Sequence, residues 1–352
     1  MNQFIIQMPS SVPTPVQQKQ IDRKYGMFLH FGINTFHNKE WSDGTLPAIS
    51  YAPPAIHADQ WVKTAYDAGM NQVILICKHH DGFCMWDTRY TDYGVSHSSN
   101  PADVVAKTAE ACRKYGVKLG LYYSLWDRHE PCYQDTRAYI EYMKNQLTEL
   151  LDGRYGPVVE LWLDGGWEKP NREWGLDELY DLVKRLQPDC AFGVNNTLGD
   201  ESNPGMPSER YLPERCEGRE PMRYFPSDFR LRDPFFPRPG TDGDPKIYTY
   251  EGKEYYLPFE ATICVRNMNN WFWDTGYTKD PVVPPAFIAE KYRQLMEQNN
   301  ILVVNCAPNP MGKLEEYDRQ TIFEAARMLG IARGEAVLPE DSCSAGTERK
   351  SD

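Results

Sequence analysis

Short apolar runs alternate with amphipathic helical patterns along most of the chain, and this alternation limits the folds open to it. The runs are continuous in Val, Ile and Leu, which is typical of parallel strands buried on both faces. Five such runs precede residue 196 and two follow residue 258. The expected strands are 27–33, 72–77, 117–123, 158–163, 191–194, 261–265 and 301–305. The expected helices are 59–69, 101–115 (with Asn100 as N-cap), 135–151, 177–186, 285–299 and 315–329.

An eighth strand near Arg210–Leu212 would complete a (β/α)8-like TIM barrel, which we favour over an open doubly wound α/β sheet. Residues 23–335 are then one catalytic barrel, with a long irregular insertion at 196–258 that is expected to be functional. Residues 1–22 predict a loosely attached N-terminal arm, and 336–352 a disordered tail. No glycine-rich dinucleotide or P-loop motif follows any expected strand.

Net charge and cysteine content limit the binding partners and the cellular locations that we expect for this protein. With 38 Lys+Arg against 50 Asp+Glu the net charge is −12, which argues against nucleic acid or an anionic membrane as a partner. No apolar run approaches the roughly 20 residues of a membrane span. Nine cysteines without a C-x-x-C pair predict buried free thiols and a cytoplasmic location, or a periplasmic or secreted one if a signal peptide has been removed.

Chemistry in such a barrel sits where strands end, and the ends here are rich in polar and aromatic residues. Asp164 follows a buried apolar run, and the glycines after it leave room beside its carboxylate. An Asp at this place can be a helix cap or turn residue, but the flanking Trp162 and Trp167 suit a sugar-ring platform beside a nucleophile. The other strand-end candidates are His30, His79, His80, Tyr123 and Asn195.

Adjacent histidines in a strand point to opposite faces, so His79 and His80 are not expected to chelate one metal together. A metal site built with His30 and Asp164 stays an alternative, and hydrogen bonding to substrate hydroxyls is the preferred interpretation. Glu40 and Trp41 follow the first strand, and Trp271 lies in a second aromatic segment that forms either a cleft wall or core packing.

Several of these segments together resemble glycoside hydrolase family 29, the α-L-fucosidases. The matching segments are YGMFLHFG (25–32), KEW (39–41), CKHHDGFCMWDT (77–88), GLYYSLWD (120–127), ELWLDGGW (160–167), FEATICVRNMNNWFW (259–273) and NILVVNCAPNPMGKL (300–314). The resemblance covers roughly residues 20–330. It implies a (β/α)8-like catalytic barrel, here expected to lack the C-terminal β-sandwich that often follows in the family.

The resemblance also implies a retaining mechanism in which Asp164 is the nucleophile. The residues that resemble fucose-binding positions are His30, Trp41, His79, His80 and Tyr123, to which we add Glu40, Trp162, Asn195 and Trp271 as substrate-binding candidates. The family's acid/base is a Glu in a variable loop, and the window here holds Glu209, Glu214, Glu217 and Glu220. Glu214 is the first choice, with Glu217 or Glu260 as alternatives.

The implied activity is release of terminal α-L-fucose from fucosylated oligosaccharides or glycoconjugates, with no cofactor. The chemistry needs one ionised carboxyl and one that holds a proton. The alternatives are an α-L-galactosidase, a metal-dependent barrel hydrolase or isomerase, and a catalytically silent sugar-binding protein.

Overall fold

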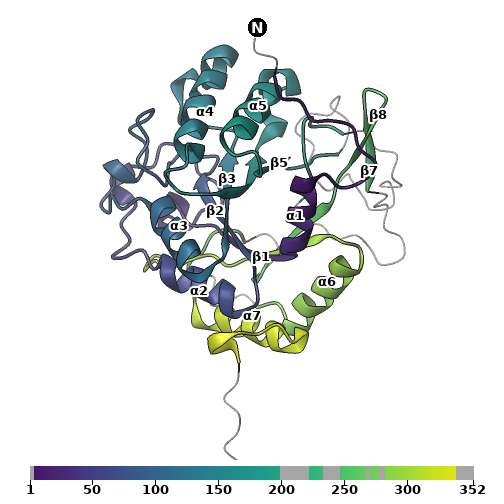
Figure 1. Ribbon diagram of the computed structural model, residues 1–352. Helices are drawn as coiled ribbons and strands as arrows, with labels where there is room; N and C mark the ends of the chain where they lie inside the picture. The colour runs from purple at the N-terminus through teal and green to yellow at the C-terminus, as the bar shows by residue number, and fades with distance from the viewer. Residues whose placement is uncertain (1–3, 199–221, 233–245, 267–269, 277–281, 338–352) are drawn as a thin grey trace, which may run out of the picture.

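The computed structural model describes residues 4–198, 222–232, 246–266, 270–276 and 282–337. Within them, eight strands form one sheet in the order β5-β4-β3-β2-β1-β10-β9-β6, and every pair in it is parallel. A bridge between Asn195 and Leu231 brings the two edges of the sheet together. The result is a nearly closed barrel with helices outside it (Figure 1), which confirms the predicted (β/α)8-like fold.

The barrel strands are short and their ends define the site. They are β1 (Tyr25–Leu29), β2 (Gln72–Lys78), β3 (Lys118–Ser124), β4 (Val158–Asp164), β5 (Ala191–Val194), β6 (Arg230–Arg232), β9 (Phe259–Cys264) and β10 (Ile301–Asn305). The described helices are α1 (Pro15–Arg23), α2 (Ala58–Asp67), α3 (Val104–Tyr115), α4 (Thr136–Leu151), α5 (Leu176–Leu186), α6 (Pro285–Glu297) and α7 (Glu316–Leu329). Among these residues no helix is long and apolar enough to span a bilayer.

The eighth barrel strand is β6, and not a strand near Arg210–Leu212, which lies outside the described residues. β6 is only three residues long and is defined by its pairing with β9. The insertion also contains an antiparallel hairpin of β7 (Ile247–Tyr250) and β8 (Lys253–Tyr256). The insertion at 196–258, expected to be irregular apart from one strand near Arg210–Leu212, thus contains three strands in its described part.

Helix α3 begins later than its sequence suggested. Asp103, and not Asn100, is the N-cap, because its side chain accepts a hydrogen bond of 2.7 Å from the N–H of Ala106. The predicted end is confirmed, since Gly116 follows the helix with a φ of +70°.

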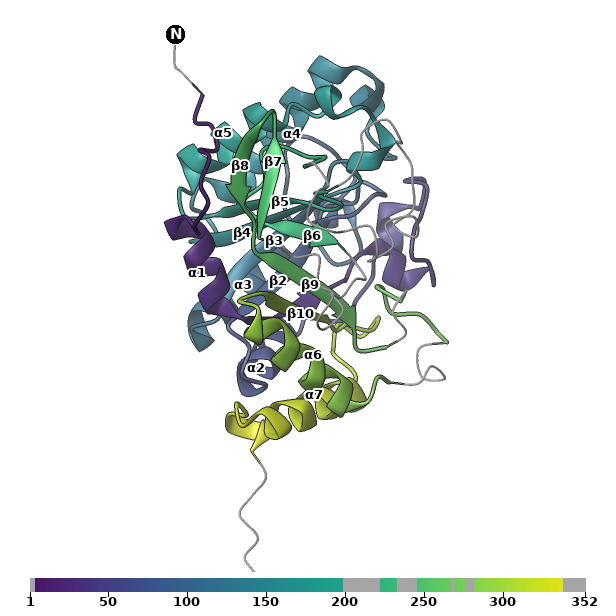
Figure 2. The ribbon, with the colours of Figure 1, turned by 90° about the vertical axis from the view of Figure 1, so that its right-hand side faces the viewer.

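The N-terminal segment is more firmly held than the expected loose arm. Helix α1 places Gln17, Gln20, Ile21 and Arg23 in the interior. Arg23 forms a buried ion pair of 3.0 Å with Glu160 of β4. Residues before the helix run beside the β7–β8 hairpin (Figure 2), where the N–H of Ser10 donates to the carbonyl of Glu254 at 3.0 Å.

The two largest hydrophobic clusters divide the core by the alternation of the strands. One lies inside the barrel and contains Tyr122 and Trp162, and the other lies between the barrel and the helices and contains Tyr123 and Leu163. Seven cysteines among the described residues are free, six of them buried, as expected from the sequence. They are Cys77, Cys84, Cys112, Cys132, Cys190, Cys264 and Cys306.

Candidate active site

Asp164 ends β4 with its carboxylate facing the barrel interior. The hydroxyl of Tyr122 donates to Oδ2 at 2.7 Å, and Nδ2 of Asn195 donates to Oδ1 at 3.0 Å. Nε2 of His80 lies 3.6 Å from Oδ2. Donors to both oxygens fix the orientation of the carboxylate. Asn195, predicted to read substrate hydroxyls, thus holds Asp164 through its own amide.

The turn after Asp164 requires glycine. Gly165 has a φ of +77°, which L side chains rarely adopt. A Cβ there would lie 2.7 Å from Cβ of Trp126. Close approach of the β3 and β4 loops thus depends on this position.

The three predicted histidines lie together beside Asp164. The ring centroids of His79 and His80 are 4.2 Å apart, and those of His30 and His79 are 6.1 Å apart. The expectation that His79 and His80 face opposite sides was wrong, because β2 ends at Lys78 with a register shift after Ile76 and its alternation does not extend to them.

Burial keeps these histidines neutral at pH 7. It lowers the pKa of His30 to about 3 and that of His80 to about 4. The pKa of His79 is also lowered well below its ordinary value, by burial and by the two neighbouring rings. The cluster can therefore hydrogen-bond hydroxyl groups without adding positive charge. Within the described residues, no group of three or more His, Cys, Asp or Glu side chains is arranged to hold a metal ion.

Glu40 joins two segments near the histidines that are far apart in sequence. Its carboxylate accepts hydrogen bonds from the N–H groups of Trp271 at 3.0 Å and Phe272 at 3.2 Å. Burial raises its pKa to about 7, against the lowering effect of these two bonds. The Trp271 ring lies 5.2 Å from that of His30, so Glu40 holds Trp271 beside the histidines near Asp164.

An aromatic group packs around His80. Trp41 is 51% exposed and packs edge-on against His80 and Trp126, with centroids 5.2 and 5.6 Å away. The Trp167 ring is 5.8 Å from that of His80. Trp41 and Trp167 thus both pack against His80, the histidine nearest to Asp164.

Two aromatic predictions were wrong. Tyr123 points away from the cleft, because its hydroxyl contacts Lys78 at 2.9 Å and Gln146 at 2.7 Å in the outer layer. Trp162 lies below Asp164 in the barrel interior and is buried there. The residue missed is Tyr122, and strand alternation would have found it, since Tyr122 and Ser124 must share one face.

Glu260 is also excluded from acid/base chemistry at Asp164. It lies near the start of β9, where it accepts a hydrogen bond of 3.2 Å from the indole of Trp162 and interacts with Glu160. Glu160 is four residues before Asp164 on β4, a separation of about 13 Å along a strand. A retaining pair is about 5–5.5 Å apart. Glu209, Glu214, Glu217 and Glu220 lie outside the described residues.

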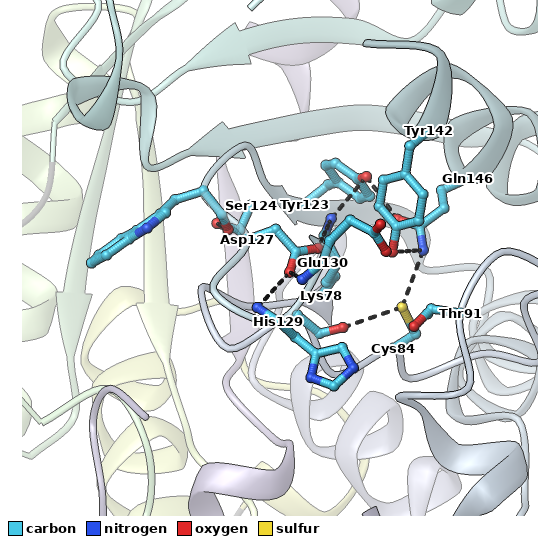
Figure 3. Close-up of polar contacts among 12 residues, drawn as sticks. Lys78, Cys84, Thr91, Tyr123, Ser124, Asp127, His129, Glu130, Tyr142 and Gln146 are labelled. Carbon is cyan, nitrogen blue, oxygen red and sulfur yellow. Dashed lines mark hydrogen bonds and ion pairs between the residues drawn. The ribbon is translucent and has the colours of Figure 1, made fainter. Parts of the chain in front are cut away.

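A buried polar network surrounds Lys78 and Asp127 (Figure 3). Nζ of Lys78, the residue before His79, lies 2.8 Å from Oδ2 of Asp127, and both side chains are inaccessible to solvent. Burial alone would lower the pKa of Lys78, but Asp127 and nearby groups outweigh it and raise that pKa. Oδ1 of Asp127 also accepts from the N–H groups of His129 and Glu130. The network ties the end of β2 to the loop after β3.

Known proteins share the fold of this chain and identify the family to which it belongs. A solved structure of a glycoside hydrolase 29 family member from an unknown rumen bacterium matches with a TM-score of 0.72 and 26% identity, covering 92% of this chain and 58% of that one. α-L-Fucosidase isoenzyme 1 from Paenibacillus thiaminolyticus matches with a TM-score of 0.72 and 25% identity, covering 90% and 75%.

The sequence pattern described as α-L-fucosidase matches residues 47–332. Alpha-L-fucosidase 1 of Arabidopsis thaliana is 35% identical over 333 residues, which are 90% of this chain and 60% of that protein. The chain belongs to the α-L-fucosidase family, glycoside hydrolase family 29. It spans about 60% of the length of this relative.

Proposed function

We propose that the protein is a retaining exo-α-L-fucosidase that releases terminal α-L-fucose from fucosylated oligosaccharides or glycoconjugates. The observation that carries the proposal is the carboxylate of Asp164, held between Tyr122 and Asn195 beside three neutral histidines. Membership of the α-L-fucosidase family supports fucose as the sugar.

In the first step Asp164 attacks the anomeric carbon while the glycosidic bond breaks, and a protonated glutamic acid gives its proton to the leaving oxygen. This forms a covalent fucosyl-enzyme. In the second step the same glutamate takes a proton from water, whose oxygen displaces Asp164 and gives fucose with retained configuration. Glu214 is our proposed acid/base, with Glu217 as the alternative.

The described carboxyl groups offer one further candidate for the proton donor. Glu40 has a pKa of about 7 and lies on the cleft wall, and a raised carboxyl pKa is what an acid catalyst needs. Its two backbone N–H partners hold it as an acceptor, however, which favours a substrate-binding role. Rescue by azide separates Glu214, Glu217 and Glu40 when each is replaced in turn. In the variant that lacks the acid/base, azide reacts with the covalent fucosyl-enzyme in place of water and forms fucosyl azide. The other two variants should form none.

The test of the mechanism is an NMR time course with an aryl α-L-fucoside, in which the α-anomer should be the first product. First appearance of the β-anomer would overturn retention. Asp164→Ala should lower kcat by several orders of magnitude while its circular dichroism stays that of the wild type. The control is Asp92→Ala, because that carboxylate is 97% exposed, and it should retain full activity.

Further measurements separate the alternative functions. An unchanged rate after chelation and the absence of stoichiometric metal by mass spectrometry would disfavour a metal-dependent hydrolase. Fucose binding without turnover would identify a silent sugar-binding protein. A higher kcat/KM on the aryl α-L-galactoside, which differs by one hydroxyl at C6, would identify an α-L-galactosidase.

A further inference from the structure

Ser124 lies between His80 and a backbone carbonyl, and its one hydroxyl hydrogen can serve only one of them. Its Oγ is 2.6 Å from the carbonyl oxygen of Trp126 and 2.7 Å from Nδ1 of His80. A carbonyl oxygen cannot donate, so the hydroxyl hydrogen points to Trp126. The hydroxyl oxygen must then accept its second bond from His80, and Nδ1 of His80 carries a hydrogen.

Asn305 imposes the same arrangement on His30. Its Nδ2 donates to the carbonyl oxygen of Trp271 at 2.9 Å, which fixes the orientation of the amide. The amide oxygen therefore faces Nδ1 of His30, at 2.7 Å. Because an amide oxygen only accepts, Nδ1 of His30 must also carry a hydrogen.

A neutral imidazole carries one N–H, and the partner of one ring nitrogen decides the state of the other. Both rings are neutral at pH 7, so Nε2 of each has a free lone pair. Nε2 of His80 lies 3.6 Å from Oδ2 of Asp164, which is also an acceptor. These two acceptor atoms cannot hydrogen-bond to each other. A ligand group that donates hydrogen bonds can lie between them and bind to either one.

We infer that Ser124 and Asn305 are positioning residues that hold His80 and His30 with Nε2 as an acceptor, so that the cleft recognises hydroxyl groups that donate hydrogen bonds. The inference rests on the proposed function for the identity of the ligand, a sugar. It deepens that function, because a hydroxyl of the sugar donates to His80 beside the attacking carboxylate. The tautomers themselves are a property of the free protein.

The direct test is 15N NMR of the full-length protein labelled at histidine, without ligand. Signals are assigned by their loss in His80→Gln and His30→Gln. The expected result is a pyridine-type Nε2 and a protonated, pyrrole-type Nδ1 for both residues at pH 7. A protonated Nε2 on either residue would overturn the inference for that residue, whether or not the protein hydrolyses fucosides.

Ser124→Ala tests the positioning role, and the chain offers a matched control. Ser50 makes the same pair of contacts outside the cleft, with Oγ 2.7 Å from Nε2 of His37 and donating to the carbonyl of Pro47 at 2.6 Å. Ser124→Ala should give a mixture of His80 tautomers and raise KM about tenfold, and Ser124→Thr should restore both. Ser50→Ala should leave the kinetics and the His80 spectrum unchanged. A wild-type His80 spectrum in Ser124→Ala would refute the role of Ser124.

Fluorinated sugars test the direction of the hydrogen bonds. Organic fluorine accepts weakly and cannot donate, so replacing a recognised hydroxyl by fluorine should weaken binding as much as replacing it by hydrogen. Inhibition constants are measured for L-fucose and its monodeoxy and monodeoxyfluoro analogues. We expect equal losses of about tenfold at the positions that His80 and His30 contact. Loss with the deoxy analogues alone would mean that the histidines donate.

Discussion

Replacing Lys78 by methionine should lower the free energy of unfolding by about 3–5 kcal/mol. The substitution leaves the carboxylate of Asp127 buried without its counter-ion, and both side chains have exposed fractions of 0–1%. At the observed 2.8 Å separation, Coulomb's law gives an attraction of about 6 kcal/mol for an effective dielectric constant of about 20. The variant no longer has to desolvate an ammonium group, and this offsets part of the lost attraction.

The assay is a double-mutant cycle of Lys78→Met and Asp127→Asn by urea unfolding, followed by circular dichroism and fluorescence. The double variant should be more stable than the sum of the single losses predicts, by about 2–3 kcal/mol. Lys114→Met is the control, because its pair with Asp59 is more than half exposed and should contribute little to stability. Additive losses in the cycle would refute the argument that the two charges depend on each other.

Tyr122→Phe should reduce kcat/KM about 10- to 100-fold, because a hydrogen bond to a charged acceptor is lost, whereas Tyr123→Phe should lower the urea midpoint with kcat/KM near the wild-type value. Equal kinetic losses in the two variants would contradict the assignment of strand faces. The folded-state pKa of His30, about 3, lies below its unfolded value of about 6.5, so its contribution to stability is present above pH 6.5 and is lost as the pH falls towards 3. Between pH 6.5 and 4.5 this loss is about 2 kcal/mol, and thermal and urea unfolding of His30→Gln should show that much less acid destabilisation than the wild type.

Sequence patterns predicted the barrel and the position of Asp164 because both are determined by residues that are close together in the sequence. Continuous apolar runs identify buried parallel strands, and the last residue of such a run must lie at the carboxyl edge of the sheet. Strand parity was equally available, since Glu160, Trp162 and Asp164 share the inner face. Applying it consistently would have chosen Tyr122 over Tyr123.

Features set by contacts between distant segments could not be predicted in this way. The orientation of His79 and His80 depends on where the pairing of β2 with β3 shifts after Ile76, which no local pattern encodes. β6 is three residues of alternating Arg and Leu, and only its neighbour β9 makes it a strand. The pairing of Glu40 with Trp271 joins residues 231 positions apart.

The way in which α1 docks constrains how the newly made chain folds on the ribosome. The amide of Gln17 donates to the carbonyls of Asp228 and Tyr256, and Arg23 pairs with Glu160. These partners are synthesised 137–239 residues after the helix itself. Helix α1 therefore lacks these partners until Glu160, Asp228 and Tyr256 have been made. Closure of the barrel is therefore a late event, because it needs segments from both the early and the late part of the sequence.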